Sequence, residues 1–133
     1  MLLELDLPYE GVEVAFRRMK FFVMGRNCDD YTKNFSFRLR QGHRWELAPA
    51  YDFTFAHNLT GAWTYQHRIS VNGKLKDITR DDLLAQAAQF DVRMARDLLE
   101  QVRRAVQDWP AHADAARVSA VEVQRIRSQL IVL

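Results

Sequence analysis

The stretch "NCDDYTKNFSFRLRQGHRWELAPAYDF", residues 27–53, begins with two adjacent aspartates, continues to a Lys-Asn pair and ends near a further aspartate. Between these residues, "FSFRLR" and "WELA" alternate apolar with polar side chains on either side of the turn-prone "QGHR". This pattern predicts two antiparallel strands with one buried and one wet face. A short hairpin fixes where both of its ends emerge, so we expect the polar residues that flank it to be held together. They are Asp29, Asp30, Lys33, Asn34 and Asp52.

The segment before this stretch predicts an amphipathic helix that starts after Pro8 and Gly11 and runs to about Arg26. Its apolar residues recur at helical spacing, and we interpret them as core rather than as a binding groove. Turn-prone Gly25 and Asn27 then end the helix. The apolar stripe consists of Val12, Ala15, Phe16, Met19, Phe22 and Val23.

The segment after it, "RISVNGKLKDI", predicts a second hairpin around Asn72 and Gly73. Thr79 with Asp82 three residues later is typical of a capping box at a helix start.

The last third of the sequence predicts a longer helix with an apolar face from Val92 to Trp109, interrupted by Pro110. A final helix is expected from about Ala113, with its apolar stripe packed on the helix before it. The predicted fold is therefore α+β and mainly helical: a helix, two short hairpins and three helices in a single domain, residues 1–133.

Composition sets the broad class. With 133 residues, 48% of them hydrophobic and 27% charged, the chain fits one folded domain. The net charge is only +2, and the basic residues are interleaved with acidic ones. This pattern disfavours nucleic-acid binding but leaves it as an alternative. Cys28 is the only cysteine, so no internal disulfide can form. The sequence has neither a membrane-length apolar run nor a signal peptide, and we expect a cytoplasmic protein.

Asp29 and Asn34 lie five positions apart, the separation between the catalytic aspartate and the metal-binding asparagine of protein kinases. Asp52 follows the hairpin, where a second metal ligand would be expected. Magnesium prefers hard oxygen ligands and usually takes only one or two carboxylates from the protein. Lys33 would offset phosphate charge. The alternative is that these residues serve only turns and caps, which Asp and Asn favour.

"NCDDYTKNFSF" followed by "WELAPAYDF" resembles the catalytic stretch of the HipA-like serine/threonine kinases of bacterial toxin-antitoxin systems. That family carries a D-x-H-x-K-N-x-S loop and then an L-x-P-x-Y-D segment. "FRRMKFFVMGRN" and "HRISVNGKLKDITRDDLL" are also similar to the family's C-terminal lobe, so the resemblance extends to about residue 90. It implies phosphorylation of Ser or Thr on a protein substrate, with ATP and Mg²⁺ as cofactors and a DNA-binding antitoxin as partner.

By this resemblance Asp29 is the catalytic base, Asn34 and Asp52 hold magnesium, and Lys33 matches a family lysine that would bind phosphate. Tyr31 stands where the family has histidine, and an aromatic ring there would preserve packing.

The resemblance does not include the N-terminal kinase lobe, because neither a glycine-rich loop nor a strand lysine precedes Asp29 in this sequence. We therefore expect weak ATP binding and negligible turnover from this chain alone. It would be the C-terminal lobe of a longer kinase, a shortened relative, or a lobe completed by a separate chain. The competing interpretation is a non-enzymatic interaction module that kept the fold and lost the chemistry.

Other polar residues are assigned ordinary roles. We expect Asp30 to be a solvated neighbour of Asp29, Cys28 to be a small buried loop residue and His43 to lie in the hairpin turn. A solvated strand face is expected for the arginines of the hairpin, which are Arg38, Arg40 and Arg44.

Overall fold

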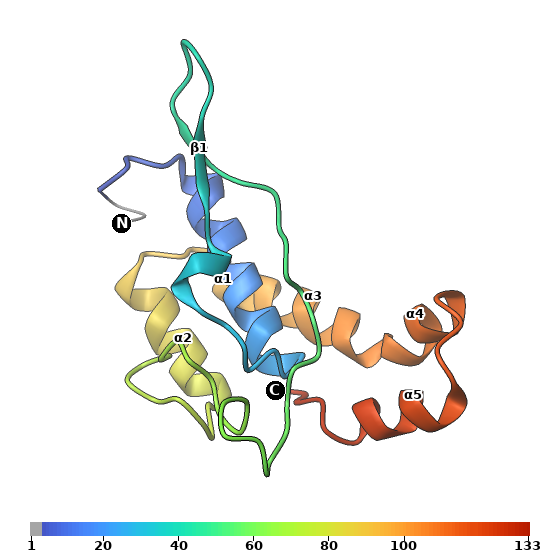
Figure 1. Cartoon of the computed structure of the whole chain (residues 1–133). Helices are drawn as coiled ribbons and strands as arrows, with labels where there is room; N and C mark the ends of the chain where they lie inside the picture. Colours follow the sequence, from blue (N-terminus) through green and yellow to red (C-terminus); the bar gives the residue numbers. More distant parts are fainter. Residues whose placement is uncertain (1–3) are drawn as a thin grey trace.

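The structure is a computed structural model that describes residues 4–133. In this range the chain forms five α-helices, a short 3-10 helix and one two-stranded antiparallel sheet, so the predicted mainly helical α+β class is confirmed (Figure 1). None of the helices in this range is long and apolar enough to cross a membrane. The elements are α1 Tyr9–Met24, η1 Thr32–Asn34, β1 Phe37–Leu39, β2 Trp45–Leu47, α2 Arg80–Gln89, α3 Ala95–Gln107, α4 Trp109–Ala115 and α5 Ala120–Arg127.

The first hairpin forms as predicted, with Phe37 opposite Leu47 and His43 in the turn. Gly42 has a φ of 76°, a left-handed conformation that glycine adopts without steric cost. The expected buried face is wrong for the outer half, because Leu39 is 54% exposed. The hairpin projects from the helical body (Figure 1), so its tip is left in solvent.

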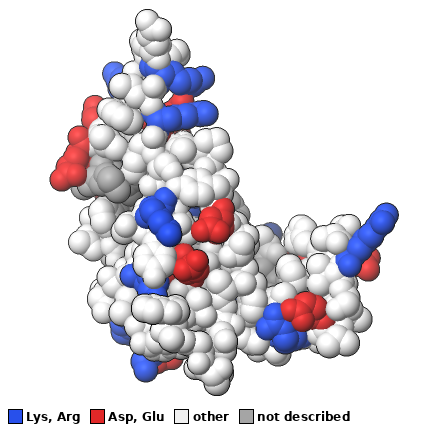
Figure 2. Space-filling view, viewed as in Figure 1, with Lys and Arg blue, Asp and Glu red and all other residues white. Residues whose placement is uncertain are grey.

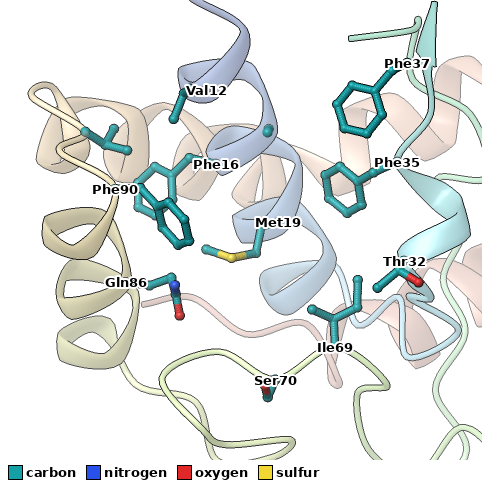
Figure 3. A pocket seen from close by; sticks show the side chains of 12 residues that line it. Val12, Phe16, Met19, Thr32, Phe35, Phe37, Ile69, Ser70, Gln86 and Phe90 are labelled. Carbon is teal, nitrogen blue, oxygen red and sulfur yellow. The ribbon is translucent and has the colours of Figure 1, made fainter. Parts of the chain in front are cut away.

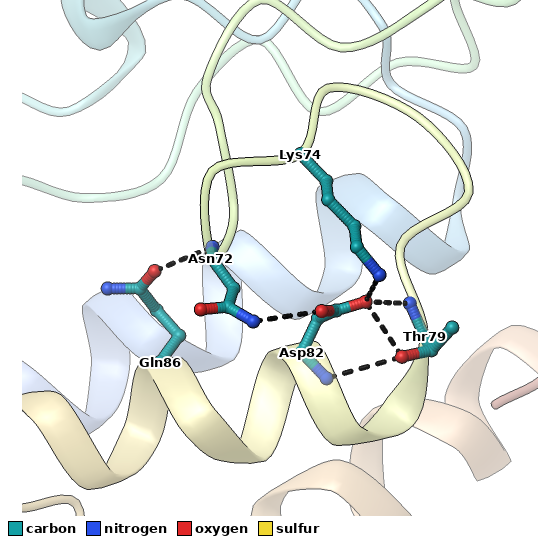
Figure 4. A network of polar contacts seen from close by, with 5 residues as sticks. All are labelled: Asn72, Lys74, Thr79, Asp82 and Gln86. Atoms are coloured by element: carbon teal, nitrogen blue, oxygen red, sulfur yellow. Dashed lines mark hydrogen bonds and ion pairs between the residues drawn. The ribbon is translucent and has the colours of Figure 1, made fainter.

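The second predicted hairpin is wrong. Asn72 and Gly73 do form a turn with φ values of 50° and 78°, but only the bridge between Val71 and Lys74 accompanies it. The side chains of the turn bind the start of α2 instead of supporting strands. Lys74 Nζ lies 2.8 Å from Asp82 Oδ2 (Figure 4).

The predicted start of α2 is confirmed. The hydroxyl of Thr79 accepts a hydrogen bond from the Asp82 main-chain nitrogen at 3.3 Å. In return the Asp82 carboxylate accepts one from the Thr79 main-chain nitrogen at 2.9 Å, which completes a capping box.

The C-terminal region contains one more helix than predicted. Pro110 lies in the first turn of α4, where its missing N–H is not needed by the helix. The single helix expected from about Ala113 is wrong, because α4 ends at Ala115 and Arg117 adopts a left-handed φ of 57°. Ser119 then caps α5. The predicted packing of the last helix on the long helix before it is only partly confirmed, because α5 contacts α4, which was not predicted as a separate helix. Val123 and Ile126 of its predicted apolar stripe are buried, whereas Ala116 and Ala120 are exposed.

The core forms around α1, which packs against α3. The predicted apolar stripe is confirmed as core at Phe22 and Val23, which are each 1% exposed, whereas its other residues also line a pocket. Those residues are Val12, Ala15, Phe16 and Met19. A charged residue, Lys20, is also fully buried on this helix. Its Nζ donates to the carbonyl of Ala95 at 3.2 Å and lies 4.1 Å from the ring centroid of Phe16. The end of the chain returns to the core, where the Ile131 main-chain nitrogen donates to the carbonyl of Met24 at 2.9 Å.

Charged side chains of both signs are interspersed on the face shown in Figure 2, with a group of basic residues on the projecting hairpin. The predicted solvated strand face is confirmed there, since Arg38, Arg40 and Arg44 are all exposed. Arg38 and Arg40 also pair with Glu46 across the hairpin at 2.9 and 2.8 Å.

Candidate functional site

The loop that follows α1 ends in η1, whose last residue, Asn34, is only 1% exposed. Asn34 Nδ2 donates a hydrogen bond to the main-chain carbonyl of Asp29 at 3.1 Å. This contact fixes the orientation of the amide and uses its nitrogen. The Oδ1 atom is therefore the one left to bind a ligand, next to the exposed Asp29.

The segment after the hairpin returns to this loop and brings Asp52 with it. The Tyr51 hydroxyl donates to the main-chain carbonyl of Lys33, the residue before Asn34. Asn27 Nδ2 donates to the main-chain carbonyl of Asp52 at 2.8 Å. In both contacts the acceptor is a main-chain carbonyl, so neither contact engages the side-chain carboxylate of Asp52.

Main-chain bonding and aromatic packing hold the two segments side by side. The Cys28 nitrogen donates to the Ala56 carbonyl and the Ala56 nitrogen to the Arg26 carbonyl, both at 3.0 Å. Beneath them, the ring of Phe22 lies 5.7 Å from Phe35 and 4.8 Å from Phe53, measured between centroids. One buried residue of α1 thus supports both sides of the candidate site, and this is the physical link that a loop pattern alone does not reveal.

Asp52 has a left-handed backbone, with φ of 57°. Among residues other than glycine, Asp and Asn tolerate this conformation best, and it costs others roughly 1–2 kcal/mol. Asp77 has nearly the same φ, 52°, so this conformation does not by itself mark a functional residue.

The Lys33 ammonium lies 5.1 Å from the ring centroid of Tyr31. Tyr31 is 37% exposed, so it contributes little to the core and instead faces the lysine.

The donor atoms suit magnesium shared with phosphate. An amide oxygen of Asn34 and a carboxylate of Asp52 are hard ligands, and magnesium is commonly held by one or two protein carboxylates together with phosphates and water. Across residues 4–133 no three His, Cys, Asp or Glu side chains cluster as a metal cage would require. The roles of Asp29, Lys33, Asn34 and Asp52 remain predictions.

A family model, the HipA-like C-terminal domain, matches residues 2–109. The chain belongs to this family. Comparisons with curated proteins and with solved structures found no significant match. The matched region includes α1, the candidate site, α2 and all of α3, and the resemblance stated from the loop motif is confirmed. Membership relates the chain to the kinase part of HipA-type proteins.

In this HipA-like domain Asp30 is not solvated, and that prediction is wrong. Asp30 is 3% exposed. Its Oδ2 lies 2.9 Å from Nδ1 of the buried His67, and its Oδ1 accepts a hydrogen bond from the Arg68 main-chain nitrogen at 2.6 Å. The adjacent Asp29 is exposed. The partners of Asp30 lie 37 and 38 positions away, so no local pattern in the sequence signalled that it would face inward.

Two other residues of the HipA-like domain matter to the site. Asn27, predicted only as a helix stop, is 1% exposed and holds Asp52 in place. Cys28 is fully buried as predicted, and burial raises the pKa of its thiol to about 11. The thiol therefore stays protonated at neutral pH and is a poor nucleophile.

Proposed function

We propose that this chain is the C-terminal lobe of a HipA-like protein serine/threonine kinase and carries the magnesium-binding side of its phosphoryl-transfer site. The observation that carries the proposal is the Asn34 amide, oriented by the carbonyl of Asp29 and placed beside the segment that contains Asp52. Membership in the HipA-like family supports it.

In this proposal Asp29, exposed at the start of the loop, accepts the proton of the substrate hydroxyl. Asn34 Oδ1 and the Asp52 carboxylate hold magnesium, and Lys33 offsets charge on the phosphates. When bound, the magnesium ion neutralises charge that develops on the transferred phosphoryl group.

Phosphoryl transfer depends on positioning and charge neutralisation from both sides of the nucleotide. We therefore propose that this lobe binds Mg-ATP weakly by itself and acts with an N-terminal lobe, supplied by the same or a separate chain. A DNA-binding antitoxin is the proposed regulatory partner, and a protein with an accessible serine or threonine is the proposed substrate.

The test is a Mg-ATP titration followed by amide NMR shifts. We expect shifts clustered at Asp29, Asn34 and Asp52, and their loss in Asp52→Ala. Asp77→Ala is the matched control, because Asp77 is also an exposed aspartate with a left-handed φ, 52°. The control should respond as the original chain does. No shift at millimolar nucleotide would contradict ATP handling by this chain.

A non-enzymatic interaction module is the second candidate function. The observation that favours it is Tyr31, an exposed tyrosine at the position of the family histidine. This function predicts a stable fold without any response to Mg-ATP.

A further inference from the structure

A predominantly apolar pocket of about 290 Å³ adjoins the candidate site (Figure 3). The side chains in Figure 3 converge on it from α1, from α2 and from the two ends of η1. Its lining includes Ala15, Phe16, Met19, Phe35, Ile69 and Phe90.

One wall of the pocket belongs to the same turn as the candidate metal ligand. Thr32 and Phe35, which both line the pocket, lie on either side of Lys33 and Asn34. Thr32 is three residues after Asp29, so their Cα atoms are at most about 11 Å apart at 3.8 Å for each residue. An extended peptide of about three residues spans as much as this upper limit.

A second wall is fixed to the loop by buried polar groups. Ile69 and Ser70 line the pocket directly after His67 and Arg68, which both bind the carboxylate of Asp30. A buried carboxylate is costly unless it is hydrogen-bonded, so this contact holds the segment in one place. The loop that carries Asp29 and Asn34 thus contributes one wall of the pocket and anchors another, so the pocket lies beside the candidate site.

We propose that this pocket receives a large apolar side chain of the protein substrate, about three residues from the serine or threonine that is phosphorylated. The inference rests on the function proposed above and adds the substrate class. An engineered apolar cavity of about 150 Å³ binds benzene, so a pocket of about 290 Å³ has room for Leu, Met or Phe. The exposed hydroxyl residues Thr32 and Ser70 at its edge suit the main chain of a bound peptide.

The test compares serine-containing peptides that carry one leucine, placed about three residues before or after the serine, with the same peptides carrying alanine. They are titrated into the chain without nucleotide and followed by amide shifts. In the better register the leucine peptide should bind at least about tenfold more tightly than its alanine partner. Its shifts should centre on Thr32, Phe35, Ile69 and Ser70.

Two variants close the pocket in different ways. Ala15→Leu fills it from the buried side of α1 with a good helix former, and Thr32→Phe covers its mouth from an exposed position. Ala85→Leu, on the exposed face of α2, is the control. We expect both pocket variants to lose the preference for leucine and the control to keep it.

Equal binding of the leucine and alanine peptides, or a preference that persists in both pocket variants, would overturn the proposal. So would self-association that shifts the same amides without peptide, because a second copy would then fill the pocket. The peptide titration contains no nucleotide, whereas the Mg-ATP titration reports on Asn34 and Asp52. Failure of either proposal can therefore be distinguished from failure of the other.

Discussion

The polar cluster around Asp82 and the candidate site both combine Asp, Asn and Lys, but they use the polar atoms of these residues in opposite ways. Around Asp82, the side chains of Asn72, Lys74 and Thr79 all donate to one carboxylate, joined by the Thr79 main-chain nitrogen (Figure 4). These contacts lower the pKa of the Asp82 carboxyl well below its usual range, with the Lys74 hydrogen bond as the largest cause.

The candidate site combines the same residue types with a different use of their atoms. Its two segments are joined through main-chain carbonyls: Asn27 Nδ2 donates to that of Asp52 and the Tyr51 hydroxyl donates to that of Lys33. Within the first segment, Asn34 Nδ2 donates to the carbonyl of Asp29. The side chains of Asp29, Lys33 and Asp52 are left exposed. The carboxylate of the first cluster is fully used in contacts that stabilise the fold, whereas the second cluster is assembled through main-chain atoms and leaves its charged side chains exposed.

The largest effect on stability is expected at Phe22, whose ring packs against both segments of the candidate site. Phe22→Ala should lower the free energy of unfolding by about 3–5 kcal/mol, because it removes a ring that is 1% exposed and contacts both Phe35 and Phe53. Denaturant unfolding measures the loss, and amide shifts should change at Asn34 and Asp52. Leu99→Ala, in a core position 2% exposed, is the control that should destabilise by a similar amount without changing those amides. Identical shift changes in both variants would refute a special role for Phe22.

Asp82→Ala should lower the melting temperature by about 5–10 °C, because it removes the capping box and the acceptor of the Lys74 ammonium. The folded pKa lies below the unfolded one, so the carboxylate stabilises the fold above about pH 4 and loses this effect as pH falls. The difference between the variant and the original chain should therefore shrink from pH 4 towards pH 2. Thermal unfolding followed by circular dichroism measures it. A difference that stays constant over this range would contradict the assignment.

Lys20 provides a further comparison with Asp82. The buried Lys20 ammonium donates to the carbonyl of Ala95, whereas the Asp82 carboxylate accepts from several donors. Burial, and to a lesser extent the charge of Arg17, lowers the pKa of Lys20 to about 7. Lys20→Met should raise the free energy of unfolding by about 2 kcal/mol at pH 7. In the unfolded chain the lysine stays protonated up to about pH 10.5, so the stability of the original chain should rise between pH 7 and 10.5. Denaturant unfolding across this range should show the advantage of Lys20→Met disappearing, and an advantage that grows with pH would show the charge to be favourable.

The smallest effect on stability is expected at the candidate ligand. Asp52→Gly should change the free energy of unfolding by less than about 1 kcal/mol, because glycine suits the left-handed backbone but loses more entropy on folding. Asp77→Gly should behave alike in denaturant unfolding, since its φ of 52° is nearly the same. Only Asp52→Gly should abolish the response to Mg-ATP. A large destabilisation confined to Asp52→Gly would place Asp52 with the structural cluster instead.

Features set by local chemistry could be predicted from the sequence. Periodicity gave the buried face of α1, and Thr79 with Asp82 gave the start of α2. The failures have non-local causes. The turn at Asn72 has the sequence of a hairpin, but its side chain binds Asp82 of α2 instead of supporting strands. Asp30 was predicted to be solvated, but it is buried against His67, which lies 37 positions away in the sequence. The left-handed Arg117 that separates α4 from α5 carries no turn-forming signature in its sequence.

For the candidate site, the motif spacing predicted which residues take part but not the contacts that bring their segments together. Asn27 and Phe22 join the two segments through a side-chain-to-carbonyl bond and ring packing. Both depend on the path of the chain after the hairpin. No local pattern encodes that path.

Broadening of amide signals by Mn²⁺ in the presence of ATP tests most directly whether the two segments form one cation site. A single site predicts broadening centred on Asn34 and Asp52 together, and its loss in Asp52→Gly but not in Asp77→Gly. Broadening spread over exposed carboxylates such as Asp77 and Asp81, with Asn34 unaffected, would contradict it.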